Sequence, residues 1–218
     1  MSTILCIETA TTNCSVAIGV SGKLLGIKEY NSLQFSHAEK LHLSIVHLLE
    51  ENNLNLEDLD AVAISKGPGS YTGLRIGVSA AKGLCFSLDI PLISVPTLNS
   101  LALQLKGQET VIAMLDARRM EVYSAGFNGN MEQIRETKAQ ILEESSFAEF
   151  LQQGPVHFIG TGVGKFSEIC SHPNAIFFEG RLPSAKEMIA TAHEKFRSRD
   201  FEDVAYFEPY YLKDFMPG

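Results

Sequence analysis

Two acidic residues, Glu8 and Asp116, each follow an apolar run of strand-forming residues and precede a short turn. A carboxylate in that position can hold Mg²⁺ through water or act as a base in phosphoryl transfer. Glycines in the turn would let backbone N–H groups reach the phosphates. The two turns, residues 8–11 and 116–119, contain no glycine, and a glutamate is one methylene longer than an aspartate. Two interpretations therefore stay open: a nucleotide site, or acids that only cap turns.

A nucleotide cleft would draw on both turns and on the glycine loop Gly160–Gly164, which follows a predicted strand as a base-binding loop would. The candidate residues are Glu8, Thr9, Thr11, Asp116, Arg118, Gly160 and Gly162. Considered without the other residues, the glycine loop is better explained as an ordinary tight turn. Because Cβ atoms in both turns hinder the approach of a phosphate, we expect this cleft to be degenerate.

The most distinctive stretch is GPGSYTGLRIG, residues 67–77. No Gly-Lys-Ser/Thr follows at P-loop spacing, and Ser70 does not lie in a Gly-x-Ser-x-Gly sequence. Neither a phosphate loop nor a nucleophile elbow is indicated. Gly67 and Gly69 permit a sharp strand-to-helix turn, and Ser70 or Thr72 can cap the helix that follows.

Gly73, Gly77 and Ala81 lie four residues apart on this helix and so share one ridge. Small residues at that spacing let a second helix approach closely. The ridge either receives a helix of another chain or packs inside its own lobe, and the sequence does not decide between the two.

Histidines and cysteines do not form a metal motif. His37, His42 and His47 are five residues apart, so each is rotated by about 140° from the last around a helix. His193-Glu194 lacks the second histidine of a His-Glu-x-x-His site. We expect no metal site and no catalytic residue. Cys6, Cys14, Cys85 and Cys170 are widely spaced, which favours reduced thiols over a disulfide framework.

The elements that would position these residues follow from hydrophobic period and turn residues. In the first half we predict strands over 4–7, 15–20, 23–30, 61–65 and 92–95, with helices from Ser36 to about Asn52, over 71–88 and after Pro96. In the second half we predict strands over 111–115, 121–127, 132–138 and 156–159, with helices over 146–152 and 184–197.

Each half thus contains a strand, an acid, a hairpin, a helix, a strand and a glycine loop in the same order. Ile4 and Ile112 correspond at an offset of 108 residues, which is too long for a solenoid repeat. The fold class predicted is α/β, with two duplicated actin-like (ASKHA, RNase H-like) lobes, each a mixed sheet flanked by helices. We place the lobes at residues 1–104 and 105–218, with the last residues able to pack back on the first lobe.

Composition limits the setting and the partners. The net charge is −8 and no basic stripe stands out, so the chain is not expected to grip an RNA backbone alone. The N-terminus lacks a signal-peptide pattern, and no run of about 18 apolar residues exists to span a membrane. We expect a cytoplasmic protein without a membrane partner.

Several segments together resemble one family. They are ILCIETATTNCSVAI (4–18), SHAEKL (36–41), KGPGSYTGLRIGVSAAKGL (66–84), LDARRMEVYSAGF (115–127) and EPYYLK (208–213). The chain resembles the TsaB (YeaZ) family, the bacterial partner proteins in making threonylcarbamoyladenosine beside the tRNA anticodon. It departs from the family pattern at Glu8, where Asp is usual, and at Arg119-Met120, where Gly is often present.

The resemblance implies a non-catalytic subunit that binds and activates a TsaD-like catalytic chain. A TsaE-like ATPase would join the complex, tRNA would be reached only through it, and a homodimer would use a similar surface. The implied interface comprises His37, Lys40, Leu41, Tyr71, Thr72, Gly73, Arg75, Ile76, Gly77 and Ser79. No cofactor would be held tightly by this chain, and ATP with Mg²⁺ would lie at the complex interface or on partner subunits.

Two other functions stay open on the residues alone. The first is an actin-like ATPase or small-molecule kinase that uses Glu8 and Asp116. The second and weaker one is a glycoprotease-type peptidase, which the histidine spacing argues against.

Overall fold

The computed structural model describes residues 2–31 and 37–213, which form two compact units. Of the described residues, the first unit contains those up to Thr97 and then Pro183–Tyr211. The second contains Leu98–Leu182 together with Leu212 and Lys213. Within the described part of the chain, none of the helices is long and apolar enough to cross a membrane.

The first unit is built on a five-stranded mixed sheet. Its strands are β1 (Thr3–Glu8), β2 (Asn13–Val20), β3 (Lys23–Asn31), β4 (Ala61–Ser65) and β5 (Leu92–Val95), in the order β3-β2-β1-β4-β5. The first three strands pair antiparallel as a meander, while β4 pairs parallel to both β1 and β5.

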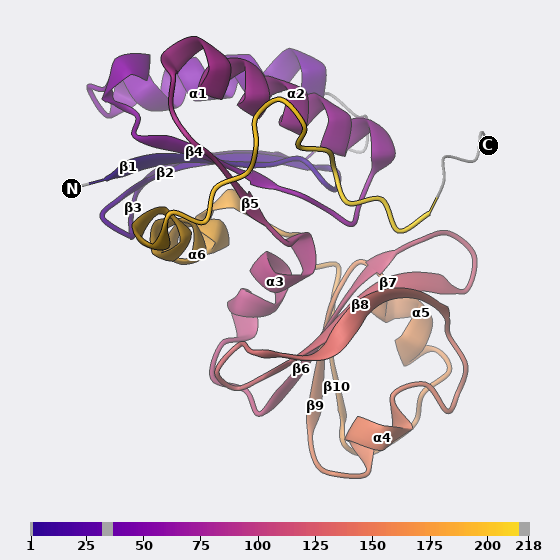
Figure 1. The fold of residues 1–218 in the computed structure, drawn as a ribbon. Coiled ribbons are helices and arrows are strands. Elements are labelled where there is room, and N and C mark those ends of the chain that lie inside the picture. The colour runs from indigo at the N-terminus through magenta and orange to yellow at the C-terminus, as the bar shows by residue number, and fades with distance from the viewer. Residues whose placement is uncertain (1, 32–36, 214–218) are drawn as a thin grey trace. The chain divides into compact units, whose positions relative to one another are not determined.

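Helices cover both faces of this sheet (Figure 1). They are α1 (His37–Glu51) and α2 (Tyr71–Leu88) on one face and α6 (Ala185–Ser198) on the other, with a 3-10 turn η1 (Leu56–Asp58) before β4. Alternate residues of β1 explain the two layers, because Leu5 and Ile7 pack with α1 and α2 whereas Ile4 and Cys6 pack with α6. The start of α1 at Ser36 was predicted but lies outside the described residues.

The second unit repeats the topology of the first. Its strands are β6 (Thr110–Asp116), β7 (Glu121–Asn128), β8 (Gln133–Ile141), β9 (Val156–Gly160) and β10 (Ala175–Glu179), in the order β10-β9-β6-β7-β8. Its helices are α3 (Thr97–Ala102), η2 (Leu103–Leu105), α4 (Ala148–Leu151) and α5 (Val163–Ser167). The prediction of two duplicated mixed sheets flanked by helices is confirmed, although β10 and α5 were not predicted.

The compact units follow a different division from the expected one at residues 104 and 105. Leu98, Leu101 and Ala102 pack against the sheet of the second unit. Helix α6 packs through Met188 and Ile189 on the sheet of the first unit. The chain therefore changes units at Thr97 and returns at Pro183, because the apolar stripe of α6 covers a face of the first sheet that α1 and α2 leave open.

The ridge of small residues on α2 faces the interior of its own unit. A Cβ atom on Gly73 would overlap the carbonyl oxygen of Thr9, and one on Gly77 would overlap the Thr9 hydroxyl. Ala81 is fully buried as well. The alternative in which this ridge receives a helix of another chain is therefore wrong. Gly83, in contrast, is exposed, and a Cβ there would meet no atom of the described residues within 4 Å.

We expect opposite effects from alanine at these glycines. Gly77→Ala should lower the free energy of unfolding by about 1–3 kcal/mol, because the added methyl group overpacks the contact with Thr9. Gly83→Ala should raise it by about 1 kcal/mol through helix propensity alone. Urea unfolding of both variants measures this difference. Equal effects at the two positions would contradict the inward placement of the ridge.

Candidate functional site

Glu8 ends β1 with its carboxyl group fully buried. Its Oε1 accepts hydrogen bonds from the Ala10 backbone N–H at 2.6 Å and from the Ser65 hydroxyl at 2.9 Å. Its Oε2 is also buried and has no hydrogen-bond partner within residues 2–31 and 37–213. Burial raises the pKa of Glu8 to about 7, although the hydrogen bonds from Ala10 and Ser65 act in the opposite direction.

The turn after Glu8 is bound to the start of α2. The Thr9 hydroxyl donates to the Gly73 carbonyl at 2.8 Å, and the Ser70 backbone N–H donates to the Ala10 carbonyl at 2.7 Å. A Cβ atom on Gly69 would lie only 2.5 Å from the same Ala10 oxygen. The Ala10 and Ser70 N–H groups are therefore used within the unit, and with the glycines of α2 packed against it this turn does not fit a magnesium–nucleotide group.

Thr11 connects the same turn to α1. The Nε2 atom of His37 lies 2.7 Å from the Thr11 carbonyl oxygen, so Nε2 carries the hydrogen of this bond. Burial lowers the pKa of His37, and the bond to Thr11 acts in the opposite direction. The turn of residues 9–11 thus contacts the first residues of both α1 and α2.

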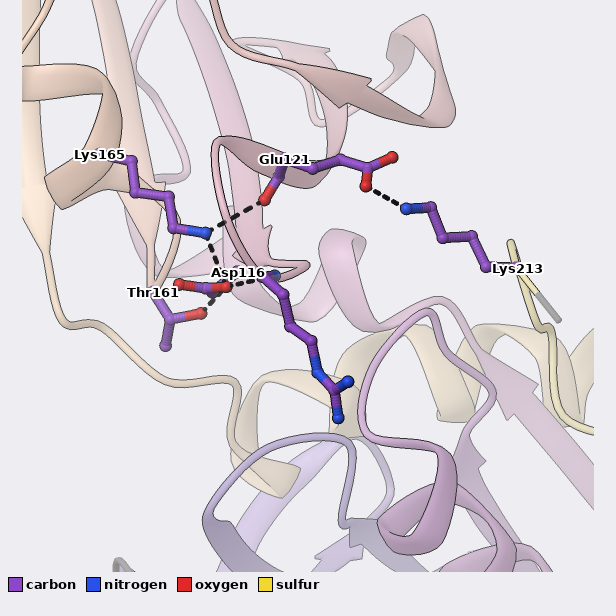
Figure 2. Close-up of polar contacts among 6 residues, drawn as sticks. Asp116, Glu121, Thr161, Lys165 and Lys213 are labelled. Atoms are coloured by element: carbon purple, nitrogen blue, oxygen red, sulfur yellow. Dashed lines mark hydrogen bonds and ion pairs between the residues drawn. The ribbon is translucent and has the colours of Figure 1, made fainter. Parts of the chain in front are cut away.

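Asp116 ends β6, the equivalent strand of the second unit, and its side chain is partly exposed (Figure 2). Its Oδ1 accepts from the Lys165 ammonium group at 2.8 Å and from the Arg118 backbone N–H at 2.7 Å. Lys165 also donates to the Glu121 carbonyl oxygen at 3.3 Å, and Lys213 forms an ion pair with the Glu121 carboxylate. The Lys165 ammonium group therefore pairs with one oxygen of the Asp116 carboxylate.

The remaining residues of the predicted nucleotide cleft have local roles. Arg118 and Arg119 take φ values of 70° and 47°, a left-handed conformation for which glycine is better suited. Gly160 has a φ of 125°, and a Cβ there would overlap the Met114 carbonyl oxygen. A Cβ on Gly162 would lie 2.7 Å from Val122. Both glycines thus allow close packing against their own sheet, as an ordinary tight turn does.

An open groove lies between α1 and α2 on the outer surface of the first unit. It is lined by Ala38, His42, Arg75, Ile76, Ser79, Ala80, Gly83, Leu84 and Ser87. Three large apolar side chains on the same helices are also solvent-exposed: Leu43 by 55%, Val46 by 46% and Phe86 by 84%. A groove bordered by helices that also expose large apolar side chains is a candidate protein-binding surface.

The predicted interface residues divide between surface and interior. Lys40, Thr72, Arg75 and Ser79 are exposed, and Tyr71 and Ile76 are half-buried. His37, Leu41, Gly73 and Gly77 are buried, so they offer no side-chain surface to a partner in this structure. The predicted set did not include the groove residues Ala38, His42, Gly83 and Leu84 or the exposed Leu43, Val46 and Phe86. Several of these groove residues could have been predicted from the sequence, because they are polar or small residues that lie between the apolar positions of each helix.

Comparison with known proteins now identifies the family. The chain is 31% identical to the tRNA threonylcarbamoyladenosine biosynthesis protein TsaB of Escherichia coli K12, over 97% of this chain and 94% of that protein. It is 30% identical to TsaB of Haemophilus influenzae, with the same coverage. The chain belongs to the TsaB family. A second match, to the family model TsaD, "tRNA N6-adenosine threonylcarbamoyltransferase", covers residues 32–215 of the TsaB-family chain.

Solved structures agree with this assignment. YeaZ from Pseudomonas aeruginosa superposes with a TM-score of 0.83 at 30% identity, over 97% of this chain and all of that one. A second structure, described as a protein with similarity to peptidase YeaZ from the same species, gives a TM-score of 0.88 at 29% identity over 98% of this TsaB-family chain and all of that one. The expected α/β class with two mixed sheets is confirmed. In the described part of the chain, no three His, Cys, Asp or Glu side chains are grouped to hold a metal.

The buried Glu8 predicts a pH-dependent stability. The pKa of Glu8 in the folded chain is about 7 against an ordinary 4.5, so the folded state binds the proton more tightly than the unfolded state. Stability should therefore fall as the pH rises from about 4.5 to about 7, by up to about 3 kcal/mol. Glu8→Gln should remove this fall, because the amide oxygen can still accept from Ala10 and Ser65 but never ionises.

The measurement is urea unfolding of wild type and variant at pH 5 and pH 8. Glu8→Gln should be more stable than wild type at pH 8 and close to it at pH 5. Glu50→Gln, which removes an exposed carboxylate on α1, serves as the matched control and should leave the wild-type pH profile in place. Parallel profiles for wild type and Glu8→Gln would refute a perturbed Glu8.

Proposed function

We propose that this chain is the non-catalytic subunit of the assembly that makes threonylcarbamoyladenosine next to the tRNA anticodon, and that it binds and activates a TsaD-like catalytic chain. The observation that carries the proposal is the similarity to TsaB proteins over nearly the whole chain. The apolar groove between α1 and α2 is the surface on which we place the partner.

The match to the TsaD family model supports the choice of partner. The matched residues 32–215 include all of α1 and α2, so a TsaD-like chain has its own counterpart of this helix pair. Two related chains can pack through equivalent surfaces around an approximate two-fold axis. A homodimer would use the same face in the same manner.

Gly83 supports a close helix contact in this groove. A glycine inside a helix costs about 1 kcal/mol relative to alanine, and no described atom near Gly83 requires the missing Cβ. Ser79 and Ser87 lie one turn before and after it on the same face, so α2 presents three small residues outward. A partner helix that crosses here could approach the α2 backbone.

The state of the two acids supports a non-catalytic role. Glu8 is buried beneath α2, and Asp116 is paired with Lys165. ATP and Mg²⁺, where they take part, are then held at the complex interface or by partners such as a TsaE-like ATPase. The net charge of −8 fits a subunit that meets tRNA only through the complex.

Leucine at Gly83 tests the docking surface. Gly83→Leu should weaken binding to the purified TsaD-type chain of the same organism by on the order of 10-fold or more, because the side chain fills the groove. Binding is measured by titration calorimetry. Ala190→Leu is the matched control, since it adds leucine at an exposed helical position on α6, over the opposite face of the sheet. Equal binding by wild type and Gly83→Leu would place the partner elsewhere.

Calorimetry with Mg-ATP on the isolated chain tests the non-catalytic role. We expect no binding at micromolar concentrations, because Glu8 is fully buried and Asp116 is paired with Lys165. Micromolar binding that is lost in both Glu8→Gln and Asp116→Asn would instead support the ATPase or kinase alternative.

A further inference from the structure

Arg75 is held on the surface of α2 by two tyrosines. Its guanidinium carbon lies 4.2 Å from the ring centre of Tyr71, within range of a cation–π interaction. Its Nε donates a hydrogen bond to the Tyr211 hydroxyl at 3.3 Å. The rings of Tyr71 and Tyr211 lie 4.8 Å apart, centre to centre, at 35° to one another.

Tyr211 belongs to a segment without helix or strand, residues 200–211, which we call the C-terminal strap. The strap follows α6, appears in yellow in Figure 1 and passes along α2. Its path is fixed at three places. The Glu202 N–H donates to the Leu92 carbonyl on β5, Lys82 of α2 donates to the carbonyls of Ala205 and Phe207, and the Tyr210 N–H donates to the Lys66 carbonyl. Val204 and Phe207 also pack against the core under α2.

The guanidinium group of Arg75 can still bind an anionic group at the groove through its terminal nitrogens. Arg75 lines the groove and is the one charged side chain among its lining residues in the described chain. Within residues 2–31 and 37–213, no carboxylate lies within ion-pair distance of it, and its two terminal nitrogens make no hydrogen bond. The fork of two terminal N–H groups matches a carboxylate in geometry and charge.

We infer that Arg75 is the charged anchor of the docking groove, that Tyr211 of the strap is the residue that positions it, and that its ligand is a carboxylate of the docked partner chain. The inference rests on the proposed function and adds a specific contact to it. A guanidinium already fixed by stacking and a hydrogen bond loses less side-chain entropy on binding than a free one. The strap thereby determines how strongly the groove binds, although it does not line the groove itself.

A second explanation of the same contacts is that Arg75 only fastens the strap to α2. The two explanations differ in the size of the effects and in salt dependence. If Arg75 only fastens the strap, Arg75→Ala weakens binding no more than Tyr211→Ala does and keeps the wild-type salt dependence. If Tyr211 acts through Arg75, removing Tyr211 from a chain that already lacks Arg75 changes nothing further. If the strap and Arg75 act separately, the two losses of binding free energy add.

The experiment is a double-mutant cycle on the full chain, with affinity for the TsaD-type subunit measured by titration calorimetry. We expect Arg75→Ala to weaken binding by about 10- to 100-fold and Tyr211→Ala by a smaller factor. The double variant should bind no more weakly than Arg75→Ala alone. Tyr211→Phe, which keeps the ring and loses the hydroxyl, should fall between wild type and Tyr211→Ala. Tyr206→Ala, a change at an 84% exposed tyrosine of the same strap, is the matched control and should bind as wild type.

Salt dependence gives a second readout. Wild-type affinity should fall more steeply than that of Arg75→Ala between about 0.05 and about 0.5 M salt, because only the former makes the ion pair. Additive losses in the cycle, wild-type affinity in Tyr211→Ala, or equal salt dependence of wild type and Arg75→Ala would each overturn the inference while the proposed function stands. Failure of the wild-type chain to bind any TsaD-type subunit would overturn both.

Discussion

The backbone of α2 lies against the turn after β1 at Gly69, Gly73 and Gly77. This contact is possible because none of the three residues carries a Cβ, so Thr9 and Ala10 come within hydrogen-bonding distance of the α2 backbone. It joins the turn after β1 to α2 within the first unit. It also fixes which face of α2 points outward, and the groove with α1 follows from that choice.

The acids that end the first strands of the two units, Glu8 and Asp116, lie in different environments. Glu8 is fully buried and forms no ion pair within the described residues. Burial therefore raises its pKa to about 7 and disfavours the ionised form that would bind a metal. Asp116 lies at the surface and is paired with Lys165.

Helix α2 and the C-terminal strap show how one element serves both stability and docking. The inner face of α2 carries glycines and Ala81 toward β1 and β4, and the outer face carries Arg75, Ser79 and Gly83. The strap contributes backbone carbonyls to Lys82 and a phenol to Arg75. An extended segment distant in sequence thus shapes the charged end of a surface whose apolar part is local to two helices.

The sequence by itself determined the elements, their duplication and the family. The bounds Tyr71–Leu88 and Leu92–Val95 were predicted as observed, because hydrophobic period and capping residues such as Ser70 act over a few neighbouring residues. Strand β10 was missed because it is short and none of its residues is fully buried. Such a strand gives little periodic hydrophobic signal.

Only the tertiary structure decided the features on which function depends. The sequence does not show whether a ridge of glycines on a helix faces solvent or the core. The ridge on α2 faces the core because it packs against Thr9, which is more than 60 residues away. Burial of Glu8 needed α2 above it, and the Lys165–Asp116 pair joins residues 49 apart. Helix α6 joined the first unit because a sheet with two apolar faces must be covered on both, and a local pattern does not specify which sheet a helix will cover.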